Sequence, residues 1–201
     1  MKSKLFTDIE KIVPTLDGWC DVEKALTLAA IVIGNRPRVT VEVGVFGGRS
    51  LIPMAMAVAD TSCGLIYAID PWSRQESVLG QKEEDAKWWR ELDHEAIYKS
   101  YLSGLERSGA GAVVKTIRST SIASIHVFSV GSIDLFHLDG NHGEQAFADI
   151  KLYYPQLAKK CVVVLDDLAW SGGFVGKAAD FLLENGFERK FDLGTGAVFS
   201  R

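Results

Sequence analysis

The chain of 201 residues contains little cysteine, no long apolar run and no excess of basic residues. Its cysteines, Cys20, Cys63 and Cys161, are far apart and show no CxxC spacing, which excludes a disulfide framework and favours reduced core cysteines in a cytoplasmic protein. The longest apolar stretch, residues 25–33, is far shorter than the ~20 residues that cross a bilayer. We expect neither a membrane span nor a signal peptide, because the basic start runs directly into acidic residues.

The charge balance excludes two classes of partner. With 22 Lys and Arg against 26 Asp and Glu, the net charge of −4 gives no basic footprint for nucleic acid. A weakly acidic surface also argues against binding to an anionic membrane. Hydrophobic residues make up 47% of the chain, which is enough for one core without disulfides. A small molecule is the expected ligand, and assembly into a homo-oligomer is left open.

Short β-branched runs alternate with helical periods along the chain. Apolar residues between the runs recur at intervals of three and four, as in amphipathic helices. Two further strands flank a turn at Gly194-Thr195-Gly196 and predict an antiparallel pair at one edge of the sheet. The order predicts an α/β fold, a Rossmann-like, seven-stranded, mostly parallel sheet with one antiparallel strand and helices on both faces. The expected strands cover residues 39–45, 65–69, 113–117, 133–138, 161–165, 188–193 and 197–200.

We expect a single domain over residues 1–201, with two segments outside the strand–helix alternation. Residues 1–36 predict two helices that form an N-terminal helical cap. Residues 71–112 form an insertion that is long for one crossover connection.

The insertion contains a polar segment, residues 74–101, that predicts a helix and carries several aromatic residues. These aromatics either pack on the helices of the sheet or line a ligand pocket. Because the polar segment has little apolar surface to hold it down, we expect a lid, with Trp88, Trp89 and Tyr98 facing the ligand.

A glycine-rich turn follows the first strand, at the edge where parallel sheets bind ligands. Gly44, Gly47 and Gly48 let the backbone approach a ligand closely, and Ser50 is in position to cap the next helix. The second strand ends in Asp70, whose carboxylate can accept both hydroxyls of a ribose. These features predict an adenosine cofactor, and a glycine turn without a ligand is the alternative. The GxGxxG pattern of dinucleotide folds is absent.

Acidic residues follow the fourth and fifth strands. If these strands are neighbours, about 4.8 Å apart, Asp139 and Asp166 emerge side by side, and Asp167 adds a third carboxylate. Like charges this close need a cation, and oxygen ligands suit Mg²⁺ or another hard divalent cation. The alternative is that one Asp caps a helix and another is solvated.

Two histidines lie near these acids. His142 could act as a general base, hydrogen-bond the substrate or cap the next helix. His137, inside a buried strand, is expected to be a core histidine with satisfied hydrogen bonds.

Several of these segments resemble a known family. Residues 41–50 resemble motif I of class I S-adenosylmethionine-dependent methyltransferases, and residues 66–70 resemble its acidic ribose loop. The D-G-x-H sequence at 139–142, followed later by Asp166-Asp167, resembles a narrower group. This group is the metal-dependent O-methyltransferases similar to the macrocin and mycinamicin sugar methyltransferases, whose relatives include cephalosporin hydroxylase-type proteins.

The resemblance implies an S-adenosylmethionine-dependent O-methyltransferase assisted by Mg²⁺ or a similar ion. An ion on the aspartates would bind two acceptor oxygens, which predicts an acceptor with vicinal hydroxyls, a sugar or a catechol-like phenol. Asp139 and His142 are the expected catalytic residues, and Asp139, Asp166 and Asp167 the expected metal ligands. Trp88, Trp89 and Trp170 are expected to contact the acceptor. The expected cofactor contacts are Glu42, Gly44, Phe46, Gly47, Ser50, Asp70, Trp72, Ser119 and Asp139.

Three alternatives stay open. A hydroxylase-like relative would use the same acidic residues for other metal chemistry. An NAD(P)-dependent oxidoreductase would use the same sheet, although the glycine spacing speaks against it. A non-catalytic protein would bind an adenosyl ligand without turning over any acceptor. Trp72 is similarly open between stacking on an adenine and covering the edge of the sheet.

Overall fold

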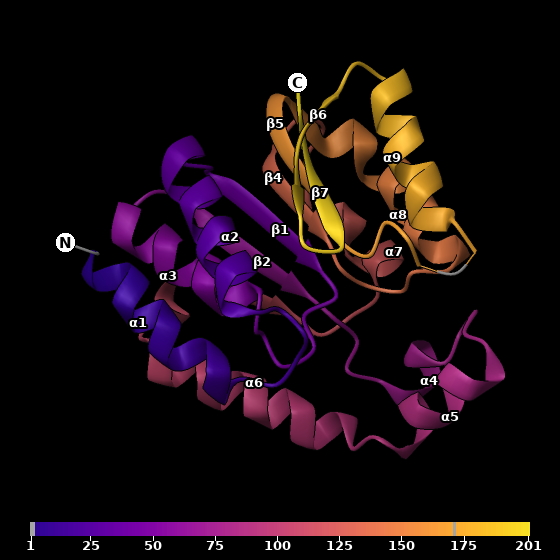
Figure 1. The fold of residues 1–201 in the computed structure, drawn as a ribbon, viewed down its shortest axis with the longest axis horizontal. Coiled ribbons are helices and arrows are strands. Elements are labelled where there is room, and N and C mark those ends of the chain that lie inside the picture. The colour runs from indigo at the N-terminus through magenta and orange to yellow at the C-terminus, as the bar shows by residue number, and fades with distance from the viewer. Residues whose placement is uncertain (1–2, 171) are drawn as a thin grey trace.

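The computed structural model describes residues 3–170 and 172–201, and within them the chain forms one seven-stranded sheet (Figure 1). The strand order is β3-β2-β1-β4-β5-β7-β6, and β7 runs antiparallel to both of its neighbours. This is the mostly parallel, Rossmann-like sheet that the sequence predicts, with the antiparallel pair at one edge. The strands are β1 (Val39–Val43), β2 (Leu65–Ile69), β3 (Val114–Ile117), β4 (Ile133–Leu138), β5 (Leu157–Leu165), β6 (Glu188–Leu193) and β7 (Gly196–Ser200).

Helices cover both faces of the sheet. Buried side chains of α1, α2, α3 and α6 form one apolar cluster with one face, and those of α8 and α9 form a second cluster with the other. No helix in the described ranges is long and apolar enough to cross a membrane. The α-helices are α1 (Lys4–Ile12), α2 (Val22–Asn35), α3 (Leu51–Thr61), α4 (Arg74–Ser77), α5 (Glu83–Glu91), α6 (His94–Ser108), α7 (Ser121–Ser124), α8 (Glu144–Tyr153) and α9 (Phe174–Glu184).

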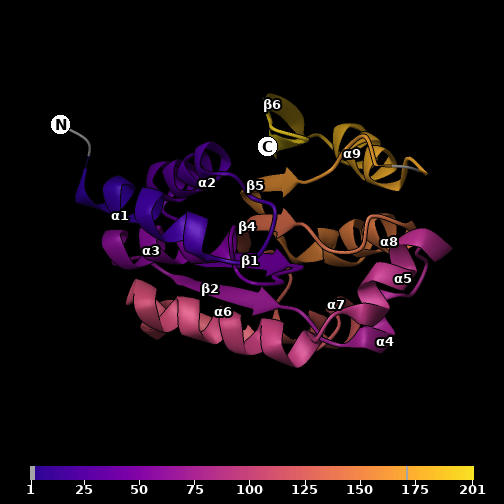
Figure 2. The ribbon, with the colours of Figure 1, turned by 60° about the horizontal axis from the view of Figure 1, so that its bottom comes forward.

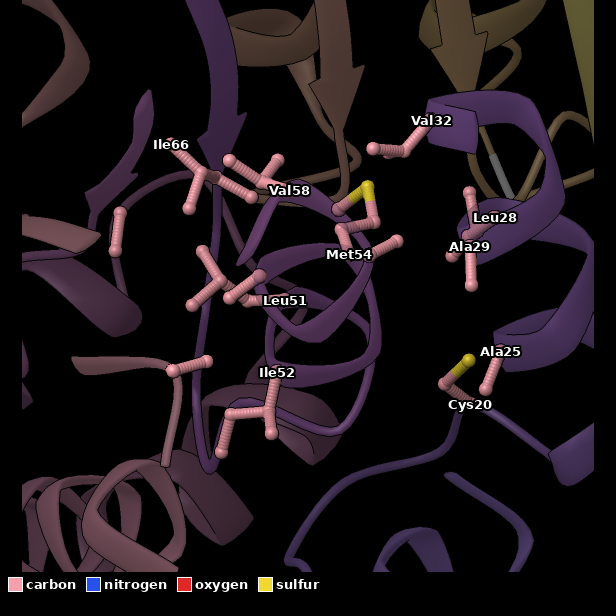
Figure 3. Close-up of a cluster of buried hydrophobic side chains, with 14 of the residues drawn as sticks. Cys20, Ala25, Leu28, Ala29, Val32, Leu51, Ile52, Met54, Val58 and Ile66 are labelled. Atoms are coloured by element: carbon pink, nitrogen blue, oxygen red, sulfur yellow. The ribbon is translucent and has the colours of Figure 1, made fainter. Parts of the chain in front are cut away.

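The N-terminal helices belong to the main core. Ala25, Leu28 and Val32 repeat along one face of α2 and are fully buried. Figure 3 shows this face of α2 directed toward Met54 of α3, while Val58 of α3 lies toward the sheet. The expected N-terminal helical cap therefore forms part of the helical layer on one face of the sheet. Packing of α2 against α3 fixes the position of the residues at the start of α2.

Several predicted boundaries were wrong. The fifth strand begins at Leu157 rather than at residue 161, where its pairing with β4 shifts register, and the third and seventh strands differ by one residue. Two further differences have clear local reasons. The first strand ends at Val43 rather than at residue 45, because Gly44 has φ +87° and turns the chain. The single helix expected over 74–101 is three helices, α4, α5 and α6. Gly80, with φ +70°, lies between α4 and α5, and the Asp93 side chain accepts a hydrogen bond from the Ala96 N–H and starts α6.

The carboxyl ends of the parallel strands lie at one edge, with α4 and α5 beside them (Figure 2). Three non-glycine residues directly beyond these strands have positive φ: Phe46 at 50°, Trp72 at 42° and Asp167 at 51°. Such backbone strain persists only where the surrounding structure imposes it, and it clusters at functional sites. The strained positions follow β1, β2 and β5 and so mark the edge at which the sequence predicts a ligand.

Candidate active site

The glycine turn after β1 is fixed by Asp70 at the end of β2. One carboxylate oxygen of Asp70 accepts hydrogen bonds from the Val45 and Phe46 N–H groups, at 2.9 and 3.0 Å. The other oxygen accepts from the Trp72 N–H at 2.7 Å. Burial outweighs these bonds and raises the pKa of Asp70 above its usual value. Asp70 therefore joins the two loops between which the sequence predicts the cofactor.

The glycines of this turn are needed by packing within the chain itself. A Cβ on Gly44 would lie 2.3 Å from the carbonyl oxygen of Asp139, and a Cβ on Gly47 would lie 2.5 Å from that of Asp17. Both distances are far inside van der Waals contact. The two glycines thus allow the turn to lie directly against the loop after β4 and the segment before α2.

The side chains of β1 and β4 form a buried polar group beneath the turn. Ser50 donates a hydrogen bond to one carboxylate oxygen of Glu42 at 2.6 Å, so its hydroxyl does not cap α3 as expected. The other Glu42 oxygen lies 3.5 Å from Nδ1 of His137. Among the described residues, neither ring nitrogen of His137 has a hydrogen-bond partner, so the expected satisfied core histidine is buried but unsatisfied.

Asp139 and Asp166 lie side by side, as the sequence predicts. The neighbouring pair Leu138 and Leu165 is in register in β4 and β5, and the two aspartates follow it. Burial and then the charge of Asp166 raise the pKa of Asp139 well above its usual value. Burial acts in the same direction on Asp166, but His137, Lys24 and a hydrogen bond from Asp139 outweigh it and lower the pKa to about 2. The pKa values of the two adjacent aspartates are therefore shifted in opposite directions.

A lysine that the sequence analysis did not single out completes this group. Lys24 of α2 forms an ion pair with Asp166, and the side chains are only 11% and 6% exposed. Burial tends to lower the pKa of Lys24, but Asp139 and Asp166 outweigh it and raise the pKa above its usual value. An ammonium group thus lies where the sequence predicts a metal ion.

The predicted metal ligands do not converge on one point. The two oxygens of Asp166 are occupied by Lys24 on one side and by the Asp167 N–H and the Thr195 hydroxyl on the other. The Asp167 side chain points to His142. Within the described ranges, the one set with ligand atoms within 4.8 Å of one another is Glu42, His137 and Asp139, which shares only Asp139 with the prediction. The arrangement does not fit a Mg²⁺ ion held by the three aspartates.

His142 and Asp167 form a pair at the same edge. Nε2 of His142 lies 3.0 Å from Oδ2 of Asp167, and the histidine holds the pKa of Asp167 below its usual value. The Trp170 ring lies 5.0 Å from the His142 ring and is 40% exposed. No side chain caps α8, which rules out the capping alternative for His142. The His142 side chain is 20% exposed, and among the described residues its Nε2 lies near the Asp167 carboxylate without completing a hydrogen bond. A partly exposed histidine beside a carboxylate is a candidate general base.

The tryptophans of the insertion join an aromatic cluster. The rings of Trp19, Phe46, Trp88 and Trp89 contact one another at centroid distances of 4.9–6.3 Å. Three of these residues line a wide-open surface cavity of about 550 Å³ between the segment before α2 and the helices α5 and α6. Ser100 and Asp17 also line it, joined by a hydrogen bond of 2.6 Å. The cavity is mostly apolar and borders the glycine turn at Phe46.

Two other predicted residues are engaged within the protein. The Trp72 ring is 3% exposed, stacks on Tyr101, contacts Tyr98 and donates its ring N–H to the Phe46 carbonyl. These contacts favour a packing role for Trp72 over stacking on an adenine. Tyr98, expected from the sequence to face the ligand, contacts Trp72 and does not line the aromatic cavity. Ser119, beyond β3, donates its backbone N–H to the carbonyl of Asp70 and so lies beside the predicted ribose position.

Comparisons with known proteins agree with this architecture. A family model described as a methyltransferase domain matches residues 41–168. No curated protein matches the chain. The chain therefore has the fold of the class I methyltransferases, and it belongs to the methyltransferase family.

Solved structures show how far the similarity in fold extends. The O-methyltransferase TomG from Streptomyces achromogenes, solved with SAM, is similar at a TM-score of 0.65 and 15% identity, over 100% of this chain and 89% of TomG. The SAH-bound methyltransferase PaMTH1 from Podospora anserina has a TM-score of 0.67 and 14% identity, over 100% of this chain and 88% of PaMTH1. An O-methyltransferase from Bacillus cereus, in complex with SAH, has a TM-score of 0.66 and 12% sequence identity. The match covers 100% of this chain and 91% of the Bacillus protein.

Proposed function

We propose that the protein transfers a methyl group from S-adenosylmethionine to a hydroxyl oxygen of a small molecule. The observation that carries the proposal is the meeting, at one sheet edge, of the turn tied to Asp70 and the His142–Asp167 pair. The first suits an adenosyl cofactor, and the second suits removal of a proton from a hydroxyl. TomG and PaMTH1, which have the same fold, were solved with SAM and SAH.

The chemistry requires little from the protein beyond alignment and a base. S-adenosylmethionine, when bound, supplies a methyl group on a positively charged sulfur, which keeps the electron pair of the broken C–S bond. Asp70 would hold the ribose, and the glycine turn, at Gly44 and Gly47, would hold the methionine part, which aligns the methyl donor with the acceptor. Nε2 of His142 faces Asp167, which leaves Nδ1 to take the proton of the acceptor hydroxyl as the C–O bond forms.

The cavity supports an acceptor with a flat, apolar ring. Trp19, Phe46 and Trp88 line it, and aromatic faces bind flat rings by stacking or edge contacts. Of the two predicted acceptor types, a sugar and a catechol-like phenol, this aromatic lining favours the phenol. A metal-assisted mechanism is not part of the proposal, because the three aspartates do not fit the ion.

A direct experiment incubates the protein with radiolabelled S-adenosylmethionine and a panel of phenols, catechols and sugars. We expect label in a phenolic or catecholic product. Transfer to none of them, in protein that binds the cofactor, would favour the non-catalytic alternative. Binding of NAD(P) in place of S-adenosylmethionine would favour the oxidoreductase.

The Asp70→Ala variant should bind S-adenosylhomocysteine much more weakly. The change removes the proposed ribose contacts and the acceptor of three backbone N–H groups that hold the two loops. We expect a loss of roughly 2–4 kcal/mol in binding free energy, measured by calorimetric titration. Asp70→Asn, which keeps one acceptor oxygen, should lose less. Unchanged affinity in folded Asp70→Ala protein would mean that the ribose binds elsewhere.

The Trp88→Ala variant should bind the acceptor more weakly without changing cofactor affinity. Trp88 lines the cavity and is 43% exposed, so its removal spares the core. We expect KM for the acceptor to rise about tenfold, a change of ~1.4 kcal/mol. Phe191→Ala is the control, because Phe191 is 45% exposed on β6, away from the cavity. Equal effects of the two substitutions on KM would contradict the acceptor assignment.

We propose that residues 73–100, within the insertion 71–112, act as a lid of the single domain, while the rest of α6 stays in the core. Within α5 only Ala86 is buried, so this helix is weakly held. The insertion nevertheless reaches both sides of the edge: Trp88 and Trp89 contact Trp19, and the Leu79 carbonyl accepts a hydrogen bond from Asn141 at 2.6 Å. These contacts would place the insertion over a bound cofactor and acceptor.

Limited proteolysis tests the lid. We expect trypsin to cut the free protein between Arg74 and Lys99, and we expect protection when S-adenosylhomocysteine and an acceptor are both present. Lys82 and Lys87 are exposed cleavage sites in or beside α5. Equal resistance with and without ligands would indicate a rigid helix pair and contradict the lid.

A further inference from the structure

The position of Lys24 is fixed by the start of α2. The Asp21 side chain caps the helix by accepting the Lys24 N–H at 2.7 Å, which sets the first turn. Ala25 and Leu28 then bury the neighbouring face of α2 against the core. With both the cap and the face fixed, the Lys24 side chain extends to the ends of β4 and β5, where it pairs with Asp166 and lies close enough to Asp139 for their charges to interact.

Three hydrogen-bond donors already surround the Asp166 carboxylate, which has about four acceptor positions. One of its oxygens accepts from the Asp167 N–H at 2.9 Å and from the Thr195 hydroxyl at 3.1 Å, and the other is bound by Lys24. A divalent ion on the pair Asp139 and Asp166 would have to displace the ammonium group or lie directly beside it. Two cations this close in a buried site repel each other strongly.

We propose that Lys24 is the resident cation of the Asp139–Asp166 pair, and that it takes the place of a divalent ion. Two adjacent buried carboxylates need positive charge nearby, and here the helix α2 supplies it as a permanent part of the chain. Lys24 is accordingly a positioning residue: it balances Asp139 and Asp166 and orients Asp166. The sequence correctly predicts that Asp139 and Asp166 are adjacent. It predicts a metal ion as their counterion, whereas the structure places the Lys24 side chain there.

The first arm of the test titrates Mn²⁺ into the purified protein, with binding followed by calorimetry and by electron paramagnetic resonance of free Mn²⁺. We expect wild-type protein to show no binding that depends on Asp139 or Asp166. Mn²⁺ binding by wild type that is abolished in Asp139→Asn or Asp166→Asn would overturn the proposal. This arm needs no substrate, so it is independent of the proposed function.

The second arm uses Lys24→Met, which keeps an unbranched apolar stem and removes the charge. We expect this variant to gain a Mn²⁺ site, with affinity about 100-fold or more above wild type, because the repelling ammonium is gone. The gain should disappear in the double variant Lys24→Met/Asp166→Asn. Lys11→Met is the matched control, because Lys11 is exposed on α1, and it should gain nothing. A folded Lys24→Met protein without the new site would contradict the proposal, and if it does not fold, the wild-type titration decides.

A third arm rests on the proposed function. Methyl transfer by wild type should survive exhaustive chelation with EDTA at an unchanged rate. Loss of transfer on chelation, restored by Mg²⁺, would overturn the inference about Lys24 but leave the methyltransferase function intact. Absence of transfer under all conditions would count against the proposed function alone, while the Mn²⁺ titrations still decide the role of Lys24.

Discussion

Replacing His142 with Gln should lower kcat for methyl transfer by about 100- to 10,000-fold, the range that a general base contributes. The glutamine cannot take the proton of the acceptor hydroxyl, although it fills a similar volume beside Trp170. Because the His142 ring pairs with Asp167 and contacts Trp170, and not the Asp70 carboxylate that holds the glycine turn, the affinity for S-adenosylhomocysteine should change little. Single-turnover kinetics with labelled S-adenosylmethionine would measure the chemical step.

Two further variants separate a base from a merely structural histidine. His126→Gln is the matched control, because His126 is exposed between α7 and β4, and it should retain full kcat. Asp167→Asn should lower kcat by a smaller factor than His142→Gln, since it disturbs only the orientation of the ring. An unchanged kcat in His142→Gln would contradict the assigned base and return attention to Asp139.

Replacing Gly44 with Ala should destabilise the protein by roughly 2–4 kcal/mol. The new Cβ would lie 2.3 Å from the Asp139 carbonyl oxygen and 2.5 Å from Cα of Gly140, both parts of the backbone that cannot rotate away. The φ of +87° adds strain for any residue with a side chain. Urea unfolding would give the change in free energy, and the same variant should bind S-adenosylhomocysteine weakly because the turn must shift.

Gly34→Ala provides the control for this clash. Gly34 lies inside α2, and a Cβ there would meet nothing within 4 Å. The substitution should stabilise the protein by about 0.5–1 kcal/mol through helix propensity. If Gly44→Ala were as well tolerated as Gly34→Ala, the close packing of the turn against the loop after β4 would be wrong.

Much of the fold could be predicted from the sequence because local pattern and chain order agree. The β-branched runs of β1, β2 and β4 are short, apolar on both faces and separated by clear helical periods. Parallel order then places Asp70, Asp139 and Asp166 at one edge. The break of the insertion into three helices was also encoded locally, by Gly80 and Asp93, but the polar periodicity of residues 74–101 concealed it.

The contents of the site depended on contacts between distant segments, which one sequence does not reveal. Lys24 reaches Asp166 only because α2 docks on the same face of the sheet as Glu42. One feature of the sequence could have singled out Lys24: it is a charged residue one helical turn before Leu28, on the apolar face of the predicted helix. The position of Trp72 after Asp70 left an adenine contact open, whereas Tyr101 of α6, about thirty residues later in the chain, stacks on its ring.

The central claim, that this sheet edge binds S-adenosylmethionine for methyl transfer, is tested most directly by calorimetric titration of S-adenosylhomocysteine into the wild-type protein and into Asp70→Ala. The account predicts one saturable site per chain in wild type and a loss of roughly 2–4 kcal/mol in the variant. Absence of S-adenosylhomocysteine binding by folded wild-type protein, or binding of equal strength in both proteins, would contradict it.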